Sequence, residues 1–325
     1  MLDPFDLPQR EARALCARGV PVYLTVNPVE YHGPHLSLHN DRLVSRGIVR
    51  ELHAALTPSG EDWPLLLGAD LEAGFEALPG QGSRQTSYAR LRELVQSACE
   101  GLARLGAQRV VLMTFHGAPL QSVALQHGVR WLGRQGIAAV APLNFLFQEL
   151  LALESPEQHA LAVAHLSDPA LRQLVLAELR TDLHAGFFET SLALHYAPES
   201  VSPVHRTLPP CPAVTPDPLL TRASRLASRL GRARLARELE LAAFGRGWTS
   251  VRPFYGYTGR PDCASPEAGA YFAAHIAALL SRGVRAVFDG SAPPPEPVLG
   301  WMRFATLGGR IPGLAVAEEA LHRFP

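Results

Sequence analysis

Short apolar runs alternate with helical patterns along this chain, and this alternation constrains the fold more than any other feature. The runs that we expect to form buried strands are residues 21–27, 64–70, 109–115, 137–143 and 285–290. Parallel strands need a crossover between them, usually a helix, so strands that alternate with helices pair mainly in parallel. We therefore predict an α/β protein with a single three-layer α/β/α domain and a mostly parallel central sheet.

The predicted α/β domain covers residues 1–290, and residues 291–325 are expected to form a C-terminal tail. Within the domain, residues 147–180 should form a helical excursion and residues 202–218 a proline-rich connector. Residues 219–244 repeat arginine at spacings of three and four, which favours an amphipathic helix with a solvated basic face. The alternative for that helix is a subunit contact or a gate for an anionic substrate.

The charge balance argues against nucleic acid or a membrane surface as a partner. The chain has 30 basic and 30 acidic residues, whereas proteins with such partners usually carry a basic excess. No apolar run approaches the roughly 18 residues of a membrane span, and the N-terminal residues lack the apolar core of a signal peptide. The four cysteines are far apart and form no CxxC pair, so we expect reduced thiols in a cytoplasmic protein.

All 30 basic residues are arginine, and the absence of lysine excludes several classes of enzyme. A P-loop needs a lysine to reach the nucleotide phosphates. Pyridoxal phosphate enzymes and Schiff-base aldolases need a lysine as the nucleophile. The sequence also contains no G-x-S-x-G nucleophile elbow and no H-E-x-x-H zinc helix.

Metal-capable side chains are concentrated in residues 29–41, "VEYHGPHLSLHND", directly after the first predicted strand. The stretch is either a polar turn that happens to contain histidines or one half of a metal site. Glu30, His32 and Asp41 are its candidate ligands, and His116 follows another predicted strand in the same way. Loops of this kind open at the carboxyl edge of a parallel sheet, where such folds bind ligands. We therefore expect these four side chains to lie close together.

A third polar cluster, "DLHAGFFETS" at residues 182–191, carries Asp182, His184 and Glu189 among the small residues of a tight turn. Mixed carboxylate and imidazole ligands suit zinc, manganese or ferrous iron. The two oxygens of an aspartate such as Asp41 can bridge two metals. The sequence therefore predicts one or two divalent metal ions per chain.

These clusters resemble the motifs of the creatininase family of metal-dependent amide hydrolases. The family pattern P-x-G-x-x-E-x-H-G-P-H-L-P-L-x-x-D is matched by "TVNPVEYHGPHLSLHND", and D-x-H-A-G-x-x-E-T-S is matched by "DLHAGFFETS". The family's N-G-H-G-G-N corresponds to "TFHGAP", and its C-terminal G-x-P-x-x-A-x-x-x-x-G is echoed by "GRPDCASPEAG". The motifs occur in the family order over about residues 20–290.

The resemblance implies a residue-by-residue assignment of the site. Glu30, Asp41 and His116 would hold one metal, and His32 would hold a second together with the bridging Asp41. His184 would be the acid/base or substrate-contacting histidine. A metal lowers the pKa of a bound water from about 15.7 to about 7, and the hydroxide so formed would attack an amide carbonyl. An imidazole would then protonate the leaving amine.

Several positions depart from the family pattern. The family's proline and glycine before the glutamate are Thr25 and Asn27, and its N-G before the central histidine is Thr114-Phe115. Creatininase itself has a glutamate two residues after that histidine, which completes its second metal site, and this chain has Ala118 there. The departures weaken the inference that creatinine is the substrate, but they leave the ligands of the first metal unchanged.

Because Ala118 cannot bind a metal, the second metal site needs another ligand, and two roles are possible for Glu189. His32 and Asp41 alone are too few ligands for a stable second site. Glu189 is the best candidate for a third ligand, and it is also a candidate catalytic residue beside His184. Alternatively, Glu189 accepts hydrogen bonds from backbone amides or a ligand histidine and binds no metal.

The sequence as a whole favours an enzyme, a metal-dependent hydrolase of a C–N amide bond in a small cyclic amide, formamide or peptide-like substrate. The alternative is a non-catalytic creatininase-like binding or scaffold protein that retains the fold and a metal. A decayed enzyme should lose ligands, and this chain retains them. The resemblance also implies a closed homo-oligomer, such as a hexamer, that acts on a small molecule.

Overall fold

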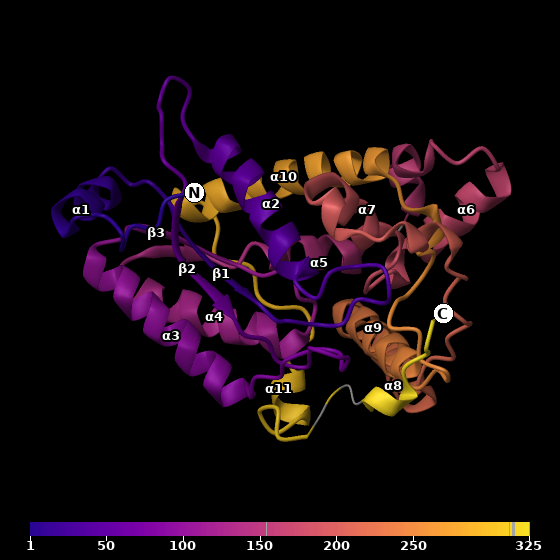
Figure 1. Ribbon diagram of the computed structural model, residues 1–325. Coiled ribbons are helices and arrows are strands. Elements are labelled where there is room, and N and C mark those ends of the chain that lie inside the picture. Colours follow the sequence, from indigo (N-terminus) through magenta and orange to yellow (C-terminus); the bar gives the residue numbers. More distant parts are fainter. Residues whose placement is uncertain (154, 312, 314–315, 325) are drawn as a thin grey trace.

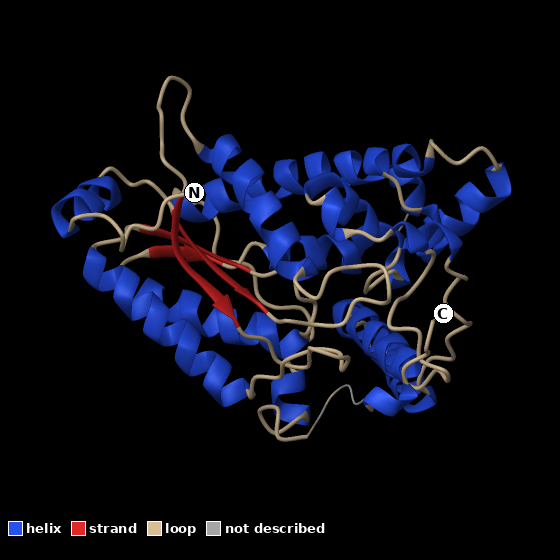
Figure 2. Ribbon diagram, in the orientation of Figure 1, coloured by secondary structure: helices blue, strands red, loops and turns tan. Residues whose placement is uncertain are grey.

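The computed structural model describes residues 1–153, 155–311, 313 and 316–324. Its centre is a sheet of four strands in the order β2-β1-β3-β4, and each neighbouring pair is parallel (Figure 2). The strands are β1 (Val22–Asn27), β2 (Leu66–Glu72), β3 (Arg109–Met113) and β4 (Ala138–Val140). The predicted α/β class with a parallel central sheet is therefore confirmed.

Helices cover both faces of this sheet, so the architecture has three layers (Figure 1). One face carries α1 (Gln9–Ala17), α3 (Tyr88–Leu105) and α4 (Pro119–Arg134). The other face carries α2 (Asn40–Leu56), α7 (Phe187–Tyr196) and α10 (Pro266–Phe288). The remaining α-helices are α5 (Leu143–Ala152), α6 (Pro169–Glu178), α8 (Pro218–Arg229), α9 (Ala233–Thr249) and α11 (Met302–Ala305).

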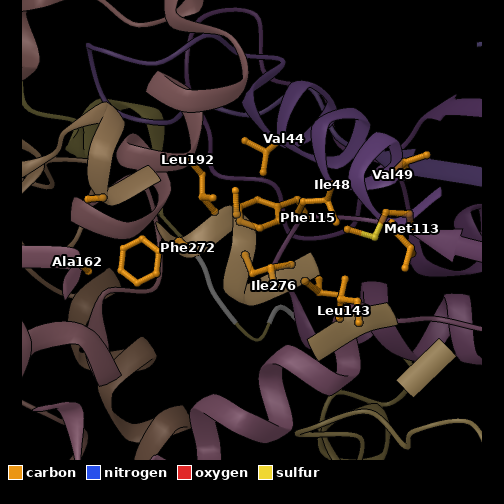
Figure 3. Packing of buried hydrophobic residues seen from close by; sticks show 14 of the residues in the cluster. Val44, Ile48, Val49, Met113, Phe115, Leu143, Ala162, Leu192, Phe272 and Ile276 are labelled. Atoms are coloured by element: carbon orange, nitrogen blue, oxygen red, sulfur yellow. The ribbon is translucent and has the colours of Figure 1, made fainter. Parts of the chain in front are cut away.

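Each face of the sheet has its own apolar core, because strands that are buried on both sides alternate their side chains between the two layers. Val22, Leu24 and Val26 of β1 point into the core under α1, α3 and α4. Tyr23 belongs to the opposite core. The helices α2, α7 and α10 complete that core with residues such as Val44, Leu192 and Phe272 (Figure 3). All six residues of β1 are buried, which places the end of this strand, and the loop after it, in the interior.

The strand expected at residues 285–290 is wrong, because residues 285–288 form the last turn of α10. Ile276, Leu280 and Val284 of α10 are buried at spacings of four residues, which is the period of one helical face. A short apolar run such as "RAVF" fits either a buried strand or the end of a buried helix, and helix length decides between them.

The segment 219–244 forms two helices and not the single helix that we expected. α8 and α9 are separated by a turn in which Gly231 adopts φ 69°. The solvated basic face is present on α8, where Arg222 and Arg225 are exposed. The stretch 147–180 contains most of α5, all of α6, the 3₁₀ helix η1 (Pro156–Val163) and part of the 3₁₀ helix η2 (Leu179–Thr181).

The proline-rich stretch 202–218 contains one short 3₁₀ helix, η4 (Pro203–Thr207), and reaches the start of α8 at its end. After residue 291, Trp301 and Met302 pack beside the buried Leu151. Further on, Leu321 forms an isolated parallel β-bridge with Phe254. Two further 3₁₀ helices, η3 (Pro198–Ser200) and η5 (Pro261–Cys263), flank the α7 region, and η6 (Glu318–Ala320) lies near the C-terminus. Within the described part of the chain, every helix is too short or too polar to cross a lipid bilayer.

The contact between α7 and α10 depends on Gly269, and this gives a test of the packing. A Cβ atom at Gly269 would lie 2.0 Å from the carbonyl oxygen of Ser191, so Gly269→Ala must push the two helices apart. We expect a loss of about 1–3 kcal/mol in the free energy of unfolding, measured by urea denaturation of the metal-free protein. Gly245→Ala in α9 is the control, since Gly245 has open space around it and should gain up to about 1 kcal/mol. Equal stability of the two variants would contradict this packing.

Candidate metal centre

The loops after two neighbouring parallel strands bring the predicted ligands together. Glu30 and His32 follow β1, His116 follows β3, and these strands pair from Val22 to Thr25. Asp41 lies in the first turn of α2, directly after the loop that carries Glu30 and His32. All four side chains are buried, with 5% exposure or less. The carboxyl edge of the sheet therefore holds a buried cluster of two carboxylates and two imidazoles.

These side chains form two groups of possible ligand atoms, and Asp41 belongs to both. In the first group, Nδ1 of His116 lies 2.8 Å from Oε2 of Glu30 and 3.5 Å from Oδ2 of Asp41. In the second group, Nε2 of His32 lies 3.1 Å from Oδ1 of Asp41 and 3.5 Å from Oε1 of Glu189. Within each group the ligand atoms lie within 4.8 Å of one another. The two oxygens of Asp41 thus face different groups, as a bridging carboxylate would.

Backbone carbonyls fix which nitrogen of each imidazole faces its group. Nδ1 of His32 lies 3.0 Å from the carbonyl oxygen of Glu30, and Nε2 of His116 lies 2.8 Å from the carbonyl oxygen of Phe75. A carbonyl oxygen can only accept, so each of these nitrogens carries the hydrogen. Nε2 of His32 and Nδ1 of His116 therefore present lone pairs to the carboxylates. This is the arrangement by which metal-binding histidines are oriented.

The first group contains buried oxygen atoms without a hydrogen-bond donor. Oε2 of Glu30 and Oδ2 of Asp41 are buried and accept no hydrogen bond, whereas Oε1 of Glu30 accepts one from the backbone N–H of Leu78 at 2.7 Å. Lone pairs of a carboxylate and an imidazole that face each other at 2.8 Å need a proton or a cation between them. The donor set and these unpaired oxygens therefore fit a divalent metal ion.

The electrostatics of the cluster favour added positive charge. Burial lowers the pKa of His32, but the adjacent carboxylates of Asp41 and Glu189 raise it well above its ordinary value. Burial acts on the pKa of His116 in the same way, and Glu30 and Asp41 raise it. Burial raises the pKa of Glu30, and the His116 imidazole lowers it, with a net decrease. A metal bound at such a site would take the place of these protons.

Glu189 occupies the first turn of α7, where its carboxylate has three kinds of contact. Oε1 accepts a hydrogen bond from Nδ2 of Asn40 at 3.1 Å and faces Nε2 of His32, while Oε2 accepts a short hydrogen bond from the backbone N–H of Ala185. Both readings of Glu189 therefore have support, because it lies within reach of the second group and also binds a backbone amide. Asp41 lies at the positive end of the α2 dipole, which favours its ionised form.

The sequence "DLHAG" builds the turn that places Glu189. Asp182 accepts hydrogen bonds from the backbone N–H of Phe188 at 2.7 Å and from the hydroxyl of Thr258 at 3.2 Å, so it caps the start of α7. Ala185 adopts φ 49°. A Cβ atom at Gly186 would lie 1.7 Å from Oδ1 of Asp182, so only glycine fits at this position.

His184 lies against the metal-ligand cluster and is oriented by one hydrogen bond. Its Nε2 donates to the carbonyl oxygen of Tyr31 at 3.0 Å, and its ring stacks on that of His32 with centroids 4.3 Å apart. Burial, followed by the nearby His32, lowers the pKa of His184. His184 also forms a third group of possible ligands with Glu30 and His32. A neutral imidazole with a free Nδ1 is thus available beside the metal centre.

Other residues of the two polar clusters support the loops and belong to none of these ligand groups. Nε2 of His35 lies 2.9 Å from the hydroxyl of Thr190, which ties the loop after β1 to α7. Burial and the nearby His205 lower the pKa of His35 to about 3. His39 is partly exposed, 3.9 Å from Glu72. The backbone N–H of Ser265 donates to the hydroxyl of Ser191 at 3.3 Å.

Asn27 is the centre of a buried network that positions His116. Its Oδ1 accepts hydrogen bonds from the backbone N–H of Phe115 at 3.0 Å, from the hydroxyl of Ser45 at 2.9 Å and from that of Thr114 at 3.4 Å. Asn27, at the end of β1, is therefore hydrogen-bonded both to the loop after β3 and to the middle of α2. Asn27, Thr114 and Phe115 are three of the positions at which the first two motifs depart from the family pattern, and Asn27 contacts the other two.

A cavity of about 110 Å³ opens beside the metal centre. Asp41, His116, His184 and Glu189 contribute to its wall. Most of the remaining wall is apolar and comes from α5, α7, α10 and the loop after β3; it includes Phe115, Leu143, Phe147, Phe188, Phe272 and Ile276. The cluster therefore faces a space in which a small molecule can bind with little competing water.

Sequence reasoning missed four residues at this site. Asn40 donates a hydrogen bond to Glu189. Its place next to Asp41 in the sequence is the one feature that could have marked it as a residue of this site. Glu149, His159 and His275 line the cavity from helical segments that have no recognisable motif. Their positions depend on how α5, η1 and α10 pack together.

A parallel α/β sheet with a buried carboxylate–imidazole cluster at its carboxyl edge is the arrangement expected of a metal-dependent hydrolase. The sequence matches the creatininase family model, described as creatinine amidohydrolase, over residues 6–284. The chain therefore belongs to the creatininase family. Among curated proteins, none matches the sequence.

Solved structures of creatininases share this fold. A glutamate-to-glutamine variant of creatininase of the Zn-Zn type is 20% identical, with a TM-score of 0.56 over 90% of this chain and 100% of that chain. A structure named "Creatininase Mn" is 20% identical, with a TM-score of 0.54 over 89% of this chain and 98% of that chain. A creatinine amidohydrolase (creatininase) is 21% identical, with a TM-score of 0.53 over 89% of this chain and 97% of that chain.

The cap residue Asp182 gives a prediction about pH. Burial raises the pKa of Asp182 to about 7, although the hydrogen bonds from Phe188 and Thr258 lower it. Between its ordinary pKa of about 3.9 and this raised value, the folded state keeps a proton that the unfolded state has released. The stability of the metal-free protein should therefore fall with rising pH in this window, by roughly 1.4 kcal/mol per pH unit from this group.

Asp182→Asn should remove this contribution. Between about pH 4 and pH 7, the unfolding free energy of the wild type should therefore fall steadily relative to that of the variant. Asp70→Asn is the control: burial raises the pKa of Asp70, but Thr25 and Arg42 lower it overall, so this carboxyl is ionised throughout. Its stability curve should run parallel to that of the wild type. A parallel curve for Asp182→Asn as well would refute the raised pKa.

Proposed function

We propose that this protein hydrolyses a C–N amide bond in a small cyclic amide, formamide or peptide-like substrate, with one or two divalent metals. The observation that supports it best is the pair of ligand groups that share Asp41 at the wall of a mostly apolar cavity. Such a cavity can bind an uncharged amide next to the metal centre. The family supplies the general class of reaction, and these residues support its placement here.

In this proposal, Glu30, Asp41 and His116 hold the first metal, and His32, Asp41 and Glu189 hold the second. Carboxylate and imidazole ligands suit zinc, manganese or ferrous iron. A metal of this kind lowers the pKa of a coordinated water and polarises a carbonyl oxygen. Amide hydrolysis requires both, a hydroxide nucleophile and an activated carbonyl. Three protein ligands per metal leave a position open for water or substrate.

His184 is the proposed acid/base residue. Its Nε2 is engaged by the carbonyl of Tyr31, so its Nδ1 is the atom that would take up or release a proton. The neutral form, favoured by burial and by His32, can accept a proton during attack and return it to the leaving amine. Phe115 and Phe188 at the cavity wall would exclude bulk water from this step.

The second candidate function is a non-catalytic binding or scaffold protein that retains the fold and a metal. Ala118 supports it, since it is buried at the start of α4 and offers no ligand. The position of Glu189 argues against it, because its carboxylate lies 3.5 Å from His32, where the second group needs a ligand. We therefore favour the enzyme.

The first prediction from this proposal concerns Glu189. Glu189→Gln should reduce bound zinc or manganese towards one per chain and abolish amide hydrolysis, because a neutral amide is a poor metal ligand. If Glu189 only supports a ligand histidine, the metal count should stay and the affinity should fall roughly 10- to 100-fold. Elemental analysis and metal titration distinguish these outcomes.

Two variants complete the Glu189 experiment. His116→Ala should lower the metal count by emptying the first group, which gives a reference for loss of one site. Glu199→Gln, a change at an exposed glutamate just after α7, should alter neither metal content nor turnover. Wild-type protein that binds no first-row metal after reconstitution would contradict the proposed function as a whole.

We also propose that the protein is a closed homo-oligomer in the cytoplasm. The exposed leucines of α8, Leu219 and Leu226 at 70% and 58% exposure, are available for a subunit contact. Light scattering at micromolar concentration should give a mass several times that of the 35.2 kDa chain. A monomeric mass would refute the assembly but not the hydrolase.

A further inference from the structure

A polar cluster lies in the wall of the cavity apart from the metal ligands. Glu149 of α5 and His275 of α10 both line the cavity, and Nε2 of His275 donates a short hydrogen bond to Oε1 of Glu149. Their side chains are 29% and 32% exposed, respectively, so the pair lies where the cavity meets solvent. His159 of η1 lies beside them, with its ring centroid 5.2 Å from that of His275.

An apolar wall separates this cluster from the metal centre. The ring of Phe115, next to the ligand His116 in the chain, lies 6.2 Å from that of Phe188, which lies 4.8 Å from that of Phe272. The ring of Phe272 in turn lies 6.2 Å from that of His159. Phe115 and Phe272 belong to one apolar cluster together with Ile276 (Figure 3). A ligand that reaches both ends of the cavity must therefore have an apolar body.

The acceptor that this cluster offers is the carboxylate of Glu149. Among the described residues, its hydrogen-bond and ion-pair partner is His275, which contacts Oε1. Both nitrogens of His159 are engaged, Nδ1 with the hydroxyl of Tyr271 at 3.2 Å and Nε2 with the side-chain nitrogen of Gln158 at 3.3 Å. The free acceptor at this end of the cavity is therefore a carboxylate oxygen.

We propose that Glu149, oriented by His275, binds a cationic group of the substrate, an ammonium or a guanidinium, at the end of an apolar body that carries the scissile amide. This inference rests on the proposed amide hydrolysis and names the class of its substrate. The apolar wall sets the distance between the two functional groups, and the carboxylate selects the charge. A compact polar amide would reach only one of the two ends.

Three series of straight-chain amides test this substrate class, with a terminal ammonium, a terminal methyl or a terminal carboxylate on chains of equal length. The zinc-loaded wild type should hydrolyse the ammonium amides with kcat/KM about fivefold or more above the methyl amides at the best chain length. Glu149→Gln should bring this ratio close to one by lowering kcat/KM for the ammonium amides. The matched control is Glu100→Gln, at a glutamate that pairs with Arg104 on α3 and should leave the ratio unaltered.

Binding of unreactive probes gives a second readout that does not depend on hydrolysis. The zinc-loaded wild type should bind hexylammonium more tightly than hexanol in calorimetry, and Glu149→Gln should lose that preference while unfolding at the same temperature as the wild type. If no amide is hydrolysed but the preference is present and depends on Glu149, the proposed function fails and the cation site stands. The cation site is overturned by a preference for the carboxylate amides, or by an ammonium preference that survives in Glu149→Gln.

Discussion

The carboxylate of Asp41, buried between two imidazoles, is the interaction on which the rest of this site depends. Isolated in the interior, such a charge would be strongly destabilising. Here one oxygen faces His32 and the other faces His116, so the same side chain needs positive charge on both sides. The start of α2, the ends of β1 and β3 and the backbone carbonyls behind each imidazole are arranged around this need. In the proposed site, a divalent metal on either side of Asp41 would meet this need.

The cavity beside this centre combines a highly charged wall with a mostly apolar one, and this contrast is relevant to the chemistry. Low polarity strengthens the electrostatic interactions that act on the reacting carbonyl. It also means that a substrate must find enough polar partners at the candidate metal centre to offset the hydration that it loses. The family membership of the chain therefore defines its reaction class more closely than its substrate. Residues such as Phe115 and Phe188, which surround the centre, select what can reach it.

Much of the fold and the metal centre could be predicted because their signals are local. Glu30, His32 and His116 each follow an apolar strand, and parallel pairing places such loops at one edge. The strand expected at 285–290 failed because a short apolar run does not by itself distinguish a strand from the end of a buried helix. Glu149 and His275 could not have been found, since α5 and α10 are far apart in the chain and only tertiary packing brings them together.

The network around Asn27 has a consequence for how sequences of this family can diverge. Its amide oxygen holds the backbone of Phe115, the hydroxyl of Thr114 and that of Ser45, so a glycine at position 27 would leave three buried groups without an acceptor. Losing Asn27 together with the hydroxyls of Ser45 and Thr114 should cost less than losing Asn27 alone, because the two hydroxyl donors then disappear with their acceptor. Position 27 is therefore epistatic with positions 45 and 114: which residue is tolerated at one of them depends on the residues at the other two. The backbone N–H of residue 115 remains whatever its side chain, so any substitute for Asn27 must still leave an acceptor for it.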